Sequence, residues 1–252
     1  MKRPIASMAT GLMLAITLVS STAMAQGHGK GREKHEEKRE DKREAKQQER
    51  NDRRVSQQEQ ERRIAEERAR QASYQRALDQ RVRLAQAQQA ALQTQRRNAQ
   101  LAYQQQYLAN LQAQRQRVAA QRNYNTDPYY TTAPQYRYRV NNVTRTTNSY
   151  GADVLKQAVN YGYDQGVQAG RADKQDGRSS SYRTAFAYQD ANYGYNGQYV
   201  SQSDYNYYFR EGFRRGYGDG YASTSQYGSV TNTGGSILGT VLSSILGLVS
   251  VP

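Results

Sequence analysis

Aromatic residues and glycines recur at four-residue spacing in the stretch YNYYFREGFRRGYGDGY, residues 205–221. On an α-helix this spacing puts the aromatic side chains in one row and the glycines in another. Each glycine in a helix interior costs about 1 kcal/mol relative to alanine, so a row of three indicates close approach by a second helix. The predicted packing residues of this helix are Phe209, Phe213, Tyr217, Tyr221, Gly212, Gly216 and Gly220.

An earlier copy of the pattern supplies the second helix. A shift of about 46 residues superimposes the stretch around Tyr163 on the later copy. Between the two copies, residues 182–193 are rich in tyrosine and alanine and predict a short middle helix. We therefore expect a helical module over residues 153–222 in which two glycine rows pack against each other. The packing residues of the earlier copy are Tyr163, Gly162, Gly166 and Gly170.

The segment 55–122 is dominated by Gln, Ala and Arg, which are good helix formers. Its apolar residues follow a seven-residue repeat that is broken at Gln89 and Arg96 and resumes in a shifted register. The pattern predicts one long helix, a weak coiled coil that pairs with itself or with a homotypic partner. Disorder is the alternative, because the apolar stripe is poor.

The other segments have simpler patterns. Residues 26–54 interleave both charge signs and predict a solvated helix or a disordered segment. Residues 123–152 and 223–235 are rich in turn formers and predict disordered linkers. Within the first, Tyr136, Tyr138 and Val140 alternate with Arg137 and Arg139 as in a short strand, but an isolated strand has no stability of its own. The apolar segment 236–252 predicts a tail helix of about 24 Å, short of the roughly 30 Å hydrocarbon core of a membrane. Docking onto the module or self-association is therefore favoured over membrane insertion.

Composition limits the size of the core. Of the 252 residues, 36% are hydrophobic, and the net charge is +14, which leaves too little apolar material for one large core. The chain has 22 Tyr but three Phe and no Trp, so the core should be amphipathic and its hydroxyl groups should need partners. The predicted fold class is mainly α: a long helix, a small Tyr/Gly-rich module and disordered linkers.

Residues 1–25 have the three parts of a secretory signal peptide. Lys2 and Arg3 precede an apolar run, and the run is followed by Ala23, Met24 and Ala25. Cleavage after Ala25 is predicted, and a retained membrane anchor is the alternative. The chain has no cysteine, which excludes disulfides, thiolate metal sites and a lipidated cysteine. The mature protein is therefore expected in the bacterial periplasm or outside the cell, without a transmembrane span.

Most of the excess charge lies on the predicted long helix. Residues 71–122 carry eight Arg against a single acid, Asp79. Such a helix suits an anionic envelope surface, such as lipopolysaccharide phosphates, and export makes nucleic acid the less favoured partner. The candidate contacts are Arg81, Arg83, Arg96, Arg97, Arg115, Arg117 and Arg122.

The parts of a catalytic or metal site are missing from the sequence. His28 and His35, its only histidines, lie in the most polar segment without a cysteine nearby. No nucleophile elbow, metalloprotease or P-loop motif is present. No catalytic residue, metal or cofactor is therefore predicted. The acidic residues of the module are interpreted as helix-surface charges matched by Lys and Arg: Asp164, Asp173, Asp176, Asp190, Asp204, Glu211 and Asp219.

The module resembles a known family. The order GYDQGVQAGRADKQDG, a Tyr-rich middle and YNYYFREGFRRGYGDGY is similar to secreted bacterial proteins without an assigned activity, often found in acidobacteria, with the pattern GYxxGxxxGxxD…YRxGFxxGYxxGY. The resemblance covers roughly residues 155–222, and Phe209 stands where the pattern has a Tyr. It implies a domain boundary and an envelope or extracellular setting, and it implies no site.

These patterns favour an exported, non-enzymatic structural or interaction protein of the cell envelope, including a homo-oligomer formed through the long helix or the apolar tail. The alternative is a polyanion-binding module that uses the arginines of 71–122. Carbohydrate binding by exposed tyrosines is a third option, for which the sequence points to no particular site.

Overall fold

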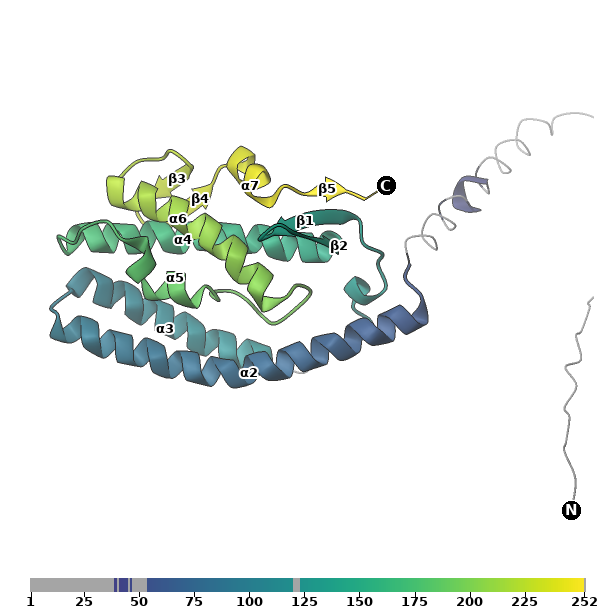
Figure 1. Cartoon of the computed structure of the whole chain (residues 1–252), viewed down its shortest axis with the longest axis horizontal. Helices are drawn as coiled ribbons and strands as arrows, with labels where there is room; N and C mark the ends of the chain where they lie inside the picture. The colour runs from purple at the N-terminus through teal and green to yellow at the C-terminus, as the bar shows by residue number, and fades with distance from the viewer. Residues whose placement is uncertain (1–38, 40, 45, 47–53, 120–122, 252) are drawn as a thin grey trace, which may run out of the picture. The chain divides into compact units, whose positions relative to one another are not determined.

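A computed structural model describes residues 39, 41–44, 46, 54–119 and 123–251 of the chain (Figure 1). The chain divides into two compact units, residues 1–48 and 49–252, and the second contains the whole of the fold described below. The predicted signal peptide 1–25, most of the charged segment 26–54 and Arg122 lie outside the described residues. Helices dominate, which confirms the prediction of a mainly α fold.

The centre of the fold is a pair of parallel helices, α4 (Ser149–Gln175) and α6 (Gln202–Ala222), which make the most extensive contact of any two elements. All six predicted glycines lie in this contact, and each faces a backbone carbonyl of the other helix. A methyl group on any of them would clash with that carbonyl, so only glycine allows this approach. The glycine and carbonyl partners are Gly162 with Phe209, Gly166 with Phe213, Gly170 with Tyr217, Gly212 with Val159, Gly216 with Tyr163 and Gly220 with Val167.

The predicted aromatic row of α6 is largely buried. Ring centroids of Phe209 and Phe213 lie 6.1 Å apart, those of Phe213 and Tyr217 lie 6.2 Å apart, and those of Tyr217 and Tyr221 lie 6.1 Å apart. Phe209, Phe213, Tyr217 and the facing Tyr163 are at most 1% exposed, whereas Tyr221 is partly exposed. The row therefore forms one wall of the core, beside the glycine contact.

The single long helix predicted over 55–122 is instead two helices, α2 (Gln57–Thr94) and α3 (Asn98–Ala119), which pack against each other. The break falls at Arg96, which takes a left-handed conformation with φ of 55°. Apolar residues of both helices, among them Leu78, Val82 and Leu111, are buried in the common core. The apolar residues of this segment thus pack inside the chain, and the helix breaks at Arg96, one of the two positions where the sequence interrupts the repeat.

The predicted linkers 123–152 and 223–235 are ordered and contain strands. The first holds a short 3₁₀ helix η1 (Pro128–Tyr130) and the hairpin of β1 (Tyr136–Val140) and β2 (Val143–Thr147). Asn141 and Asn142 join these strands with positive φ at both positions, as a tight hairpin turn requires. The strand considered too weak alone is stabilised because β2 and β5 (Val249–Ser250) flank β1 in a three-stranded sheet. A second hairpin, β3 (Gly228–Thr231) with β4 (Gly234–Ile237), packs on α4.

Two predicted helices are shorter than the pattern suggested. The middle segment 182–193 forms only a 3₁₀ turn, η2 (Tyr182–Thr184), and α5 (Phe186–Asp190), which ends where Ala191 takes φ of 53°. The tail 236–252 contains α7 (Gly239–Leu246), which docks on α4 and α6, while its ends join β4 and β5. No helix among the described residues is long and apolar enough to cross a membrane.

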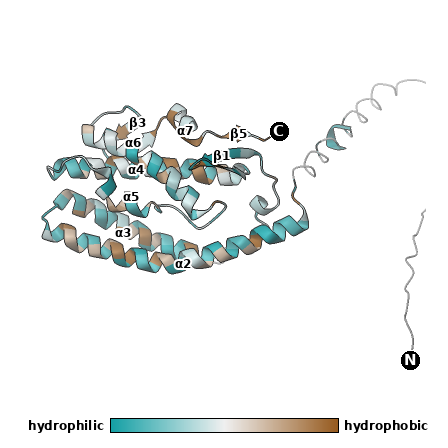
Figure 2. Ribbon diagram, viewed as in Figure 1, coloured by the Kyte–Doolittle hydropathy of each residue, from teal (hydrophilic) through white to brown (hydrophobic). Residues whose placement is uncertain are grey.

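The elements lie in layers (Figure 1). The hairpin of α2 and α3 lies on one side of α4 and α6, and the β3–β4 hairpin and α7 lie on the other. Figure 2 shows that no long helix is uniformly hydrophobic, because hydrophilic residues are interspersed along each of them. The core is built from tyrosine and alanine as much as from aliphatic residues, so its polar atoms need partners inside the fold.

Candidate functional site

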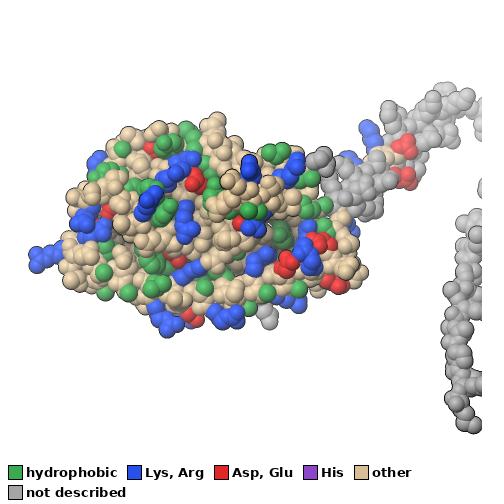
Figure 3. Space-filling model, in the orientation of Figure 1, with side chains coloured by type: hydrophobic (Ala, Val, Ile, Leu, Met, Phe, Trp, Pro, Cys, Tyr) green, Lys and Arg blue, Asp and Glu red, His purple; other side chains and the backbone are tan. Residues whose placement is uncertain are grey.

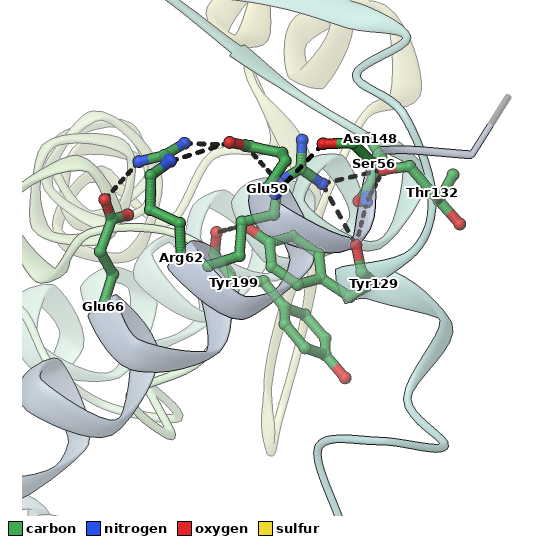
Figure 4. Close-up of polar contacts among 9 residues, drawn as sticks. Ser56, Glu59, Arg62, Glu66, Tyr129, Thr132, Asn148 and Tyr199 are labelled. Atoms are coloured by element: carbon green, nitrogen blue, oxygen red, sulfur yellow. Dashed lines mark hydrogen bonds and ion pairs between the residues drawn. The ribbon is translucent and has the colours of Figure 1, made fainter. Parts of the chain in front are cut away.

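A polar pocket of about 200 Å³ lies where the start of α2 meets η1 and the end of β2. Arginines and glutamates of α2 form one wall, and residues from Tyr129 to Asn148 form the other (Figure 4). Its lining residues are Glu59, Arg62, Arg63, Glu66, Arg70, Tyr129, Pro134, Thr146, Thr147 and Asn148.

Arg63 connects the two walls of this pocket. Its Nε donates to Glu59 Oε1 at 2.9 Å, and its guanidinium also donates to the carbonyl oxygen of Thr132 at 2.9 Å. From the other side, the amide of Asn148 donates to the carbonyls of Tyr129 and Thr132, and its Oδ1 caps α4 by accepting the Gly151 N–H. The start of α2, η1 and the start of α4 are therefore fixed to one another by hydrogen bonds.

Glu59 is held as an anion. Ser56 caps α2 by accepting the Glu59 N–H, and the Glu59 carboxylate accepts hydrogen bonds from Arg62 at 2.7 and 2.8 Å as well as from Arg63. Hydrogen bonds from Arg62 and Arg63 lower the pKa of Glu59 to about 2. At neutral pH this carboxylate therefore cannot donate a proton, and its oxygens are already committed to the two guanidinium groups.

Tyr199 lies beside the pocket in a strained conformation, with φ of 64°. Its backbone N–H donates to Glu67 Oε2 at 3.3 Å, its hydroxyl donates to Asp127 Oδ2 at 2.7 Å, and its ring stacks on Tyr129 with centroids 4.4 Å apart. These contacts, from α2 and from the η1 segment, hold the strained backbone in place. No spacing in the sequence indicates this arrangement, because it joins residues far apart in the chain.

Four aspartates interpreted as helix-surface charges are buried instead. Asp173, Asp204 and Asp219 are at most 3% exposed, and the side chain of Asp190 is 4% exposed. Each carboxylate accepts a hydrogen bond from a tyrosine of another element: Tyr217 to Asp173 at 2.6 Å, Tyr107 to Asp190 at 2.6 Å, Tyr138 to Asp204 at 2.9 Å and Tyr163 to Asp219 at 2.7 Å.

The surface interpretation failed because the donors come from other elements. The phenols that satisfy these carboxylates come from distant parts of the sequence, so local charge matching could not reveal them. Burial raises the pKa of Asp190, while Arg81 and Tyr107 oppose that rise. Of the other predicted surface acids, Asp176 caps α3, Asp164 accepts the Gly235 N–H, and Glu211 pairs with arginines of its own helix.

The arginines of the candidate polyanion surface separate into an interior group, paired with buried aspartates, and a surface group. Arg97 pairs with Asp173, and Arg81 pairs with Asp190 at 3.2 Å, so both guanidinium groups serve the interior. Arg115 pairs with Asp79 at 2.9 Å on the surface, and Arg83 donates to the Asp79 carbonyl. The remaining two described candidates, Arg96 and Arg117, are exposed.

The chemistry available at these places is limited. Within residues 54–119 and 123–251, no three His, Asp or Glu residues converge on a point that could hold a metal ion. The polar side chains of the pocket and the buried aspartates form hydrogen bonds that connect elements of the fold. No known protein family, curated protein or solved structure matched the chain.

Proposed function

We propose that this chain is an exported, non-enzymatic structural or interaction protein of the bacterial cell envelope. The observation that carries the proposal is the use of the reactive side chains. The buried carboxylates accept tyrosine hydroxyls, and the carboxylate of Glu59 in the polar pocket is bound by two arginines. General acid or base catalysis needs a group whose proton can move toward a bound substrate, and these groups are already engaged in holding the fold.

The envelope setting rests on residues 1–25, whose charged start, apolar run and Ala23-Met24-Ala25 end are typical of a cleaved signal peptide. The chain has no cysteine, so outside the cytoplasm it would be held together by packing and hydrogen bonds and not by disulfides. The core of glycine contacts and buried tyrosines supplies those interactions without disulfides.

The alternative, polyanion binding through α2 and α3, has lost part of its support. Two of its arginines, Arg81 and Arg97, are paired with buried aspartates and are not offered to an external ligand. Of the candidates that the structure describes, a phosphate ligand could still use Arg83, Arg96, Arg115 and Arg117, and Arg115 already pairs with Asp79. We therefore place the interaction role first.

Export is tested by expressing the full chain in a bacterial host and determining its N-terminus in the periplasmic and culture fractions by mass spectrometry. We expect a product that begins at Gln26. Replacing Ala23 and Ala25 with Arg should block processing, because the cleavage site needs small residues there. Met24→Gln, between them, is the matched control and should still be processed. Unprocessed wild-type protein in the cytoplasm would refute the envelope setting.

The interaction role is tested in the same cells with a photo-crosslinking amino acid at Leu84, which is 53% exposed on α2. Adducts with an envelope component or a second copy are expected there. The same amino acid at Leu78, buried on that helix, is the control and should give only intramolecular products. Absence of intermolecular adducts at Leu84, and at the exposed Val143 and Val249, would count against an interaction protein.

A further inference from the structure

The solvent-facing side of the three-stranded sheet carries two arginines on its central strand. Arg137 and Arg139 of β1 are exposed and point to the same side, because they are two residues apart on a strand. Across the hairpin, Arg137 lies opposite Thr146 and Arg139 lies opposite Thr144. On the other edge, Arg137 lies opposite Val249 of β5. The Cα atoms of the two arginines lie about 7 Å apart along the strand. The pair is thus flanked by threonine hydroxyls on one side and by an apolar residue on the other.

These two arginines differ from most others in the fold. Neither guanidinium group has a hydrogen bond, an ion pair or a ring contact among the described residues, and the one contact from outside the sheet is made by the Arg139 carbonyl, which accepts the Tyr208 hydroxyl at 3.0 Å. By contrast, Arg145 on β2 points to the opposite side of the sheet and pairs with Asp204 at 3.2 Å. Both faces of this small sheet therefore carry arginine, but only the solvent-facing pair has no carboxylate within the described part of the chain.

A groove of about 250 Å³ opens at this pair. It is lined by Arg137, Tyr138, Arg139, Thr144, Gly247 and Val249, and more of its wall is apolar than polar. Val249 is 57% exposed, a large fraction for a valine in a strand. Gly247 ends α7 with φ of 52° and has no atom near the position of a side chain, so it leaves the groove open on that side.

We propose that this groove binds the headgroup of an anionic phospholipid, with the phosphate between Arg137 and Arg139 and the start of the acyl chains over Val249 and Gly247. Arginine suits phosphate because its planar guanidinium donates paired hydrogen bonds, and the Thr144 hydroxyl offers a further donor. The inference rests on the proposed envelope function for its setting, and it adds the chemical class of the partner. Figure 3 shows Lys and Arg side chains beside hydrophobic ones over the region where Figure 1 labels β1 and β5.

The mixed character of the groove favours a lipid over a free phosphate ion. A site for free phosphate is lined by donors throughout, whereas here the arginines adjoin an exposed valine and the end of the apolar segment α7–β5. Charged residues that attract the headgroups next to apolar residues that enter the boundary region form a typical interfacial contact. The same surface would leave a free ion with bonds on one side only.

The test is binding of the purified mature chain to vesicles of phosphatidylglycerol, compared with vesicles of phosphatidylcholine, by co-sedimentation at low salt. The R137Q/R139Q double variant should bind phosphatidylglycerol vesicles about 30-fold more weakly, since each arginine near an anionic surface contributes about a factor of five. The matched control is R83Q/R117Q, which removes the same charge from α2 and α3 and should change binding by less than about threefold. Circular dichroism and thermal melting of all variants verify that each is folded.

Three results would overturn the proposal: equal weakening in both double variants, equal binding to the two vesicle types, or no binding of the wild-type chain to phosphatidylglycerol. A titration with inorganic phosphate separates the sources of the anion, and saturable phosphate binding without vesicle binding would replace the lipid by a free ion. Because vesicle binding is measured in vitro, its failure leaves the export experiment unaffected, and failed processing of the signal peptide leaves the vesicle result standing.

Discussion

Replacing Gly216 with alanine is the sharpest test of the fold's central contact. A methyl group built on Gly216 would lie 1.9 Å from the carbonyl oxygen of Tyr163, and ordinary contact starts at 3.4 Å. The obstacle is backbone and cannot rotate away, so α4 and α6 must separate by about 1.5 Å, which forfeits a large part of the dispersion energy along the contact. Overpacking of this kind costs about 1–3 kcal/mol and sometimes more.

Gly218 is the matched control on the same helix. A methyl group there would meet no atom within 4 Å, so Gly218→Ala should stabilise the protein by about 1 kcal/mol through helix propensity alone. The two variants should then differ by about 3 kcal/mol, or about 6–12 °C in melting temperature for a unit of this size. Thermal melting followed by circular dichroism measures the difference. If Gly216→Ala melts at or above wild type, the close helix contact is wrong.

Two further predictions concern groups that only the folded chain brings together. Burial raises the pKa of twelve of the 22 tyrosines above the ordinary value of 10.0, so the stability that this difference confers is present below pH 10.0 and lost as the pH rises further. Tyrosinate absorbance should therefore rise at a higher pH than it does for free tyrosine, together with loss of the circular dichroism signal. A full rise of the absorbance in a chain that is still folded would contradict the buried core. Asp176→Ala removes the cap of α3 and should cost about 1–2 kcal/mol in urea unfolding, whereas Asp153→Ala, at a carboxylate 61% exposed, should change little; equal costs would argue against the cap. The twelve tyrosines are Tyr74, Tyr103, Tyr107, Tyr129, Tyr130, Tyr138, Tyr163, Tyr193, Tyr195, Tyr205, Tyr208 and Tyr217.

The sequence predicted helices well where a single periodicity ran without interruption. The four-residue rows around Gly166 and Gly212 specify both the helices and the faces that meet, because a glycine row is costly unless another backbone fills the space. It predicted strands poorly. The segment around Tyr138 alternates as a strand should, but its stability depends on the hairpin turn that brings β2 beside it and on β5 from the other end of the fold, which the alternation does not reveal.

The candidate sites depended still more on distant residues. The pocket joins α2 to residues 129–148. No local motif predicts that Arg63 donates to the carbonyl of Thr132, because the two residues lie 69 positions apart in the chain. The exposed pair Arg137 and Arg139 was visible as an alternation, but its exposure and its lack of a carboxylate partner became apparent only with the sheet assembled.

Sequence alone determined that this protein is mainly helical and that two helices pack through rows of glycines beside a row of buried aromatic side chains. Helical spacing is a local property of the chain, so it can be read without the fold. Tertiary structure decided where the long helix breaks and what the acids do. The first free N–H groups of α3, those of Ala99 and Gln100, donate to Asp176 at the end of α4, 2.9 Å away in each case. A helix start that is capped from another element, and a buried aspartate that accepts a hydrogen bond from a distant phenol, are set by packing in three dimensions and cannot be inferred from local spacing.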